Sequence, residues 1–151
     1  SAPRLLLTYE GKQMQFDFEQ FTKRFKRAYP VAEYARRKRN GGSDCGLFAY
    51  DDALEVFREY FLAYEYYTGT AHPQLKRERI IDIIQRMDEG EAPETCPYDD
   101  MGFSPADYPA MIDAHFRTKY RNCDYNICHF FSGCIRYLRW FNTAVVDREL
   151  T

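Results

Sequence analysis

The stretch "DALEVFREYFLAYEYYTG", Asp52 to Gly69, decides the fold class of this chain. Its large apolar residues recur at spacings of 3, 4 and 3, at Leu54, Phe57, Phe61 and Tyr64. These spacings place them on one face of an α-helix, because one helical turn takes 3.6 residues. Asp52, with Glu55 three residues later, is typical of a helix start, and Gly69 is typical of a helix end. The sequence therefore predicts a long amphipathic helix here.

Helical patterns continue on both sides of this stretch. An Asp17–Gln20 pair and a Ser104-Pro105 pair are typical of helix starts, and Asp124 is expected to cap the last helix. The further expected helices cover residues 18–29, 30–39, 73–89, 105–120 and 125–146. Alternating apolar residues around Glu10-Gly11 predict a short β-hairpin before them. We therefore expect an all-α protein, mainly a helical bundle of about five helices with a short N-terminal β-hairpin, forming one domain over residues 1–151.

The composition agrees with a folded protein in the cytoplasm. Of the 151 residues, 45% are hydrophobic and 17% aromatic, with 13 Tyr and 12 Phe, so an aromatic core is expected. No apolar run approaches the roughly 18 residues that a membrane-spanning helix needs. The cysteines are odd in number and irregularly spaced, which favours reduced thiols in a cytoplasmic protein over a disulfide framework.

The charge is unevenly distributed along the chain. Residues 23–39 carry one acid, Glu33, and eight cations: Lys23, Arg24, Lys26, Arg27, Arg36, Arg37, Lys38 and Arg39. The net charge is -2, and -2 minus the local +7 leaves -9 for the remainder. Residues 88–113 contain eight acids and neither Lys nor Arg. The basic segment therefore has three interpretations: a partner or nucleic-acid site, a docking surface for residues 88–113, or a solvated face.

Three cysteines and a histidine lie close together in "RNCDYNICHFFSGCIRYLRWF", Arg121 to Phe141. On a helix, Cys128 and Cys134 are about 120° apart, whereas a chelating pair needs to share one face. We therefore expect no metal site, no cofactor, and small thiols packed in a helix interface. A candidate polar site remains, consisting of His115, Arg117, His129, Arg136 and Arg139.

An enzymatic interpretation of these residues stays open. Some metal-independent helical ribonucleases pair an arginine with a histidine four to six residues later. Arg121 precedes His129 by eight residues. Catalysis is thus less favoured than binding, and no catalytic residue is assigned.

Two segments resemble a known family. "AHFRTKYR", residues 114–121, and "FSGCIRYLRWFN", residues 131–142, are similar to two stretches of the phage abortive-infection family. The resemblance implies a helical domain that takes part in halting an infected bacterial cell.

We therefore expect a helical interaction or sensor domain that acts by binding a protein partner or a second copy of itself. The first alternative is a nucleic-acid-binding protein in which the basic segment contacts phosphates and Tyr29 and Tyr34 stack on bases. The second alternative is the ribonuclease-like enzyme.

Overall fold

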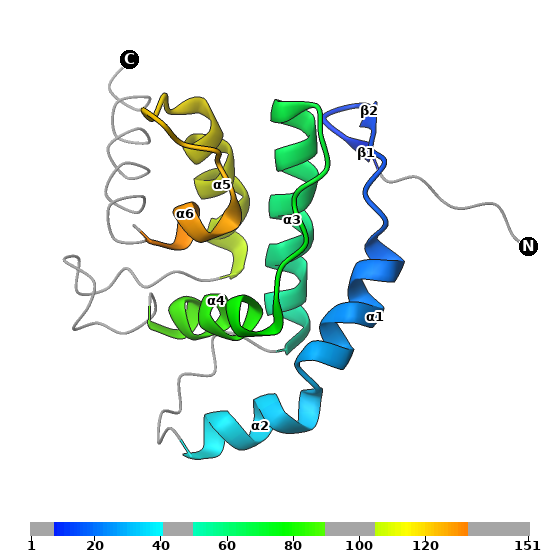
Figure 1. The fold of residues 1–151 in the computed structure, drawn as a ribbon, viewed down its shortest axis with the longest axis vertical. Helices are drawn as coiled ribbons and strands as arrows, with labels where there is room; N and C mark the ends of the chain where they lie inside the picture. Colours follow the sequence, from blue (N-terminus) through cyan, green and yellow to red (C-terminus); the bar gives the residue numbers. More distant parts are fainter. Residues whose placement is uncertain (1–7, 41–49, 90–104, 133–151) are drawn as a thin grey trace, which may run out of the picture.

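The computed structural model describes residues 8–40, 50–89 and 105–132. Within them lie six α-helices and one two-stranded antiparallel hairpin (Figure 1). The prediction of a mainly helical fold with a short N-terminal hairpin is confirmed. The helices are α1 (Phe18–Ala28), α2 (Val31–Asn40), α3 (Tyr50–Thr68), α4 (Arg77–Glu89), α5 (Tyr108–Arg117) and α6 (Ile127–Ser132), and a single 3-10 turn, η2 (Pro105–Asp107), precedes α5.

The hairpin turns at the predicted pair of residues. Strand β1 (Thr8–Tyr9) pairs with β2 (Lys12–Gln13). Glu10 and Gly11 between them have φ angles of 51° and 79°. Two consecutive positive φ angles are what a type I′ turn requires, and this turn matches the twist of the two strands.

Helix α1 begins as predicted. The Asp17 side chain accepts a hydrogen bond from the backbone N–H of Gln20, which satisfies one of the free donors in the first turn. Pro30 then separates α1 from α2, because its ring fixes φ and it has no N–H to donate. Both helices lie within a residue or two of their predicted bounds.

Helix α3 occupies the centre of the molecule, with α1 along one side and α5 along the opposite side (Figure 1). It begins at Tyr50, so the expected cap Asp52 lies in its first turn instead. Gly69, with a φ of 80°, follows its last residue as predicted. The expected start of the next helix at Pro73 is wrong, because residues 69–76 return alongside α3 before α4 begins at Arg77.

The ends of α5 and α6 also differ from their prediction, and one side chain explains both differences. Helix α5 ends at Arg117 instead of Tyr120, because the Tyr125 hydroxyl donates to Thr118 O and accepts from the N–H of Tyr120. Tyr125 itself has a φ of 59°, so it cannot begin a helix. Residues 133–146 of the expected last helix lie outside the described residues.

Asn126, and not Asp124, caps α6. The Asn126 side-chain oxygen accepts hydrogen bonds from the N–H groups of Cys128 and His129, at 2.8 and 3.3 Å. Asp124 lies before this cap, and its carboxylate accepts a hydrogen bond from the N–H of Asn126.

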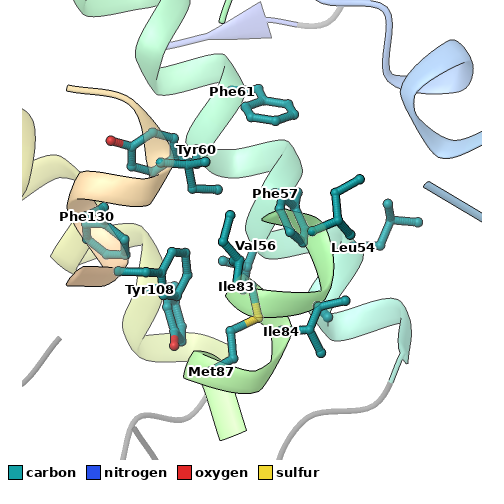
Figure 2. Close-up of a cluster of buried hydrophobic side chains, with 14 of the residues drawn as sticks. Leu54, Val56, Phe57, Tyr60, Phe61, Ile83, Ile84, Met87, Tyr108 and Phe130 are labelled. Carbon is teal, nitrogen blue, oxygen red and sulfur yellow. The ribbon is translucent and has the colours of Figure 1, made fainter. Parts of the chain in front are cut away.

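The core surrounds α3 on several sides. Phe57 contacts Phe21 and Phe25 of α1, while Tyr60 contacts Phe116 of α5 and Phe130 of α6. Figure 2 shows these α3 side chains together with Ile83, Ile84 and Met87 of α4. Each large apolar side chain buried in this way stabilises the fold by roughly 1.5–3 kcal/mol.

Candidate binding site

The basic segment begins on the outer side of α1. Phe21, Phe25 and Ala28 turn toward the core and the neighbouring helices, which leaves the intervening cations in solvent. The exposed cations of α1 are Lys23, Arg24, Lys26 and Arg27. Lys23 lies 3.6 Å from Glu19, and both side chains are largely exposed. None of the other three has a carboxylate partner among the described residues.

Helix α2 continues the segment. Arg36 is exposed, and it too has no carboxylate partner within the described part of the chain. Glu33, the one acid of the segment, binds Arg77 of α4 through both carboxylate oxygens, at 2.8 and 3.0 Å. The side chains of Arg37, Lys38 and Arg39 lie outside the described residues, although their backbone belongs to α2. We call Lys23, Arg24, Lys26, Arg27 and Arg36 the cationic face.

The two tyrosines expected to stack on bases are buried instead. Tyr29 and Tyr34 are only 2% and 6% exposed, and their rings pack edge to face, 6.0 Å apart. The Tyr50 hydroxyl donates to Tyr29 O, and burial followed by the nearby Asp51 charge raises the pKa of Tyr50 to about 12. The prediction that these rings are available to a nucleic acid is therefore wrong.

One described acid of the acidic stretch, Asp113, lies on the opposite side of α3 from the start of the basic segment. Asp113 is on α5, across α3 from α1, where it accepts from the Tyr67 hydroxyl and binds Arg117 at 3.1 Å. Burial is the main cause that raises the pKa of Tyr67. Residues 90–104, which carry four of the eight acids of the predicted docking partner, lie outside the described residues. Asp113 therefore neutralises Arg117 and does not meet the cationic face.

A pocket opens beside α1. It has a volume of about 360 Å³ and lies between α1, the returning segment 71–76, the start of α4 and the side of α3. Its apolar lining includes four phenylalanines: Phe16, Phe21, Phe25 and Phe61. Arg24, Arg27 and Arg77 line it as well, so two residues of the cationic face also belong to the pocket.

The three arginines of the pocket differ in what they bind. Arg77 donates from Nε to Ala28 O at 2.8 Å and from Nη2 to Glu33, so its charge is neutralised. Arg24 donates to the amide oxygen of Gln74 at 3.1 Å, a neutral acceptor. Arg27 makes no hydrogen bond to another described residue through its side chain. Arg24 and Arg27 therefore keep their charge available to an anion.

The acids of the pocket are already engaged by backbone donors. Glu65 is only 9% exposed, and it accepts a 2.7 Å hydrogen bond from the N–H of Gln15, which holds the end of the hairpin against α3. Asp17 accepts from Gln20 as the cap of α1. Gln15, Asp17 and Glu65 lie toward the start of α1, whereas Arg24 and Arg27 lie about two to three turns further along it. The pocket thus has its cationic end away from its acids.

His72 forms one wall of the pocket and reaches a distant helix. Its Nδ1 lies 2.8 Å from Pro73 O, and its Nε2 accepts a 3.0 Å hydrogen bond from the N–H of Ile127, the first residue of α6. The ring packs on Phe61 and Tyr64 at centroid distances of 4.6 and 4.7 Å. These bonds require a neutral ring protonated at Nδ1, and burial lowers the pKa of His72 accordingly. The sequence carries no local signal for this role, because the two partners are 55 residues apart.

The candidate polar site is partly a core cluster. His115 is fully buried, and its ring lies 5.4 Å from that of half-buried His129. Burial, with a smaller contribution from the charge of His129, lowers the pKa of His115 to about 3. The rings of Phe116, Tyr120, Tyr125 and Phe130 surround it. Arg117 points elsewhere, to Asp113, and Arg136 and Arg139 lie outside the described residues.

The described cysteines carry free thiols. Cys123 accepts a hydrogen bond from the N–H of Tyr125, and burial raises the pKa of Cys128. No three His, Cys, Asp or Glu side chains of residues 8–40, 50–89 and 105–132 come together as a metal site would require. Cys45, Cys96 and Cys134 lie outside these ranges.

Of the helices in the described residues, none combines the length and the apolar character that crossing a lipid bilayer requires. Comparison with protein-family models, with curated proteins and with solved structures yields no significant match to this chain.

Proposed function

We propose that this chain is a helical interaction or sensor domain that acts by binding an anionic surface of a partner protein through the cationic face. The observation that carries this proposal is the lack of acidic partners for Arg24, Lys26, Arg27 and Arg36 among the described residues. Unpaired surface cations create a positive potential that attracts an acidic partner and orients it on approach.

An acidic protein is favoured over single-stranded nucleic acid because of the tyrosines. Binding of single strands usually combines cations with exposed aromatic rings that stack on the bases. The aromatic residues within the basic segment are buried in the core: Phe25, Tyr29 and Tyr34. Phosphate contacts alone remain available, so nucleic-acid binding is the second candidate function.

The test measures binding to polyanions over a salt series. Fluorescence anisotropy would compare a labelled poly-glutamate peptide with single- and double-stranded DNA and RNA. The variant combines Arg24→Gln, Lys26→Gln and Arg27→Gln. We expect poly-glutamate to bind at low salt and the variant to lose most of that affinity. For duplex DNA, the plot of log K against log salt has a negative slope, and each lost phosphate contact would make that slope less steep by about 0.9.

A matched control removes three exposed cations from elsewhere: Lys12→Gln, Lys119→Gln and Arg121→Gln. It changes the net charge equally, so it should keep the affinity if the cationic face is the site. Equal losses in the two variants, or no binding to any polyanion at low salt, would refute the proposal. Tighter binding to nucleic acid than to poly-glutamate would favour the second candidate.

The biological setting that we propose is phage defence. Its support is the resemblance of residues 114–121 and 131–142 to the abortive-infection family. Expression in bacteria should lower phage yield, and the triple variant of the cationic face should restore it. Unchanged yields across a broad phage panel would contradict this setting.

A further inference from the structure

The pocket beside α1 has the dimensions of a site for one small ligand. Ligand pockets in proteins usually measure about 300–1,000 Å³ and combine an apolar lining with a few polar groups. At about 360 Å³, this pocket accommodates one ring system or one amino-acid side chain with a short polar extension. A macromolecular surface does not fit inside it, so its occupant differs from the partner that the cationic face would bind.

Contacts between aromatic rings hold the apolar part of the lining together. Phe21 and Phe61 pack edge to face at 4.9 Å, and Phe16 packs edge to face on Phe61 at 5.4 Å. Phe16 and Phe21 are only half-buried, so part of each ring remains available to a ligand. Aromatic linings of this kind favour a flat or branched apolar group over a polar one.

The polar groups of the pocket select the charge of the ligand. Arg24 and Arg27 are three residues apart on α1, so their side chains lie on neighbouring positions of one helix face. Gln74 accepts from Arg24 and thereby orients its guanidinium without neutralising it. Guanidinium groups bind carboxylates and phosphates through paired hydrogen bonds. The acids of the pocket accept from backbone N–H groups at the opposite end, so they do not oppose this charge.

We propose that this pocket binds a small amphipathic anion, whose aromatic or branched apolar group packs on Phe16, Phe21 and Phe61 and whose carboxylate or phosphate binds Arg24 and Arg27. The same chemistry can come from a free small molecule or from the C-terminal residue of a peptide. This inference shares two arginines with the proposed function, and its test uses different probes.

The test is an NMR titration of the isotope-labelled full chain with 3-phenylpropionate, phenyl phosphate and the neutral 3-phenylpropanamide. Concentrations up to about 10 mM detect the weak affinities that ligands of this size have. We expect both anions to shift the amides of Gln20, Ala28 and Gln74, and the neutral amide to bind at least about tenfold more weakly. A tripeptide ending in a free phenylalanine carboxylate, compared with its amidated form, distinguishes a peptide source from a free small molecule.

Variants test whether the two anions bind in the pocket. Arg24→Gln and Arg27→Gln should each weaken both anions about tenfold, since each loses a charged hydrogen bond. Lys119→Gln, which removes an exposed cation outside both this pocket and the cationic face, should leave the affinity unchanged. The proposal is refuted if the neutral amide binds as tightly as the anions, if both arginine variants keep full affinity, or if no probe shifts these amides.

One further variant separates this proposal from the proposed function. Ala71 lines the pocket from the returning segment and is exposed. Ala71→Trp should fill the pocket and abolish anion binding while the cationic face keeps its affinity for poly-glutamate. Loss of both activities in a variant with an unchanged unfolding temperature would show that the pocket is not a separate site. Retained anion binding would place the ligand elsewhere.

Discussion

At the scale of single residues, His115 makes the fold sensitive to acid. Its ring is buried among aromatic side chains, so the fold accepts it only in the neutral form. Its folded pKa, about 3, therefore lies below the value of 6.5 expected when it is exposed. A pKa depressed by folding adds stability above the unfolded pKa, and that stability is lost as the pH falls from 6.5 toward 3.

The first prediction follows from the lowered pKa of His115 in the folded protein. Between about pH 6.5 and pH 5, the free energy of unfolding should fall by about 2 kcal/mol because of His115 alone. His72, whose pKa is also lowered by burial, should add to the loss. Urea denaturation at several pH values measures it. His115→Phe keeps a ring in the cluster and removes the proton, so its stability should change less with pH; an unchanged pH profile would contradict the assignment.

The second prediction concerns the hairpin turn. Glu10 has a φ of 51°, a conformation that costs most residues about 1 kcal/mol and that asparagine adopts more easily. Glu10→Asn should therefore stabilise the protein by roughly 0.5–1 kcal/mol. Glu10→Val should destabilise it, because a β-branched residue is strained at positive φ. Thermal unfolding of the three proteins gives the order, and a variant with valine as stable as the wild type would disprove the turn type.

At the scale of elements, helix starts that depend on neighbours in sequence were the most predictable. Asp17 caps α1 with a bond to Gln20, a pattern visible in the sequence alone. Asp124 looked equally suitable for α6, yet Tyr125 takes a positive φ, so the capping residue is Asn126 and the helix begins at Ile127. The sequence could not indicate this, because Tyr125 adopts that conformation while its hydroxyl bonds to the backbone of residues 118–120.

The third prediction tests the distant partner of α6. His72→Ala leaves the N–H of Ile127 without its side-chain acceptor and removes the ring from Phe61 and Tyr64, which should cost about 1–3 kcal/mol. His72→Phe restores a ring without an acceptor. Hydrogen exchange at Ile127 should be faster in both variants, whereas the core contacts should weaken only in the alanine variant. Wild-type exchange at Ile127 in His72→Phe would contradict the hydrogen bond from the Ile127 N–H to His72.

At the scale of the whole molecule, α3 joins the two sides of the fold. Phe57 packs on Phe21 and Phe25 of α1, while Tyr60 packs on Phe116 and Phe130. Because both sides use one helix, we expect them to unfold together.

The fourth prediction follows from this shared helix. Phe57 is fully buried, so Phe57→Ala should cost about 3–5 kcal/mol through lost contacts and a new cavity. Near-ultraviolet and far-ultraviolet circular dichroism should give coincident transitions in the wild type and in the variant. Two separate transitions would show that the α1 side and the α5 side are independent.

The candidate site was predictable only in part. The cations of α1 stand out in the sequence, and their exposure follows from the spacing of Phe21 and Phe25. The pocket could not be predicted from the sequence, because Phe61 and the returning segment 71–76 reach α1 only in the folded chain. Tyr29 and Tyr34 were misassigned for the same reason, since Tyr50 from another helix completes their burial.

The central position of α3 also sets the order in which a ribosome can build this fold. Translation releases α1 and α3 first, and they can pair at once through Phe21 and Phe57. The opposite face of α3, with Tyr60 and Tyr67, must wait for Phe116 on α5, some 50 residues later. At 5–20 residues per second, that delay is roughly 3–10 s. During those seconds a nascent chain presents an uncovered tyrosine-rich helix, and this is the form that a cotranslational chaperone would meet.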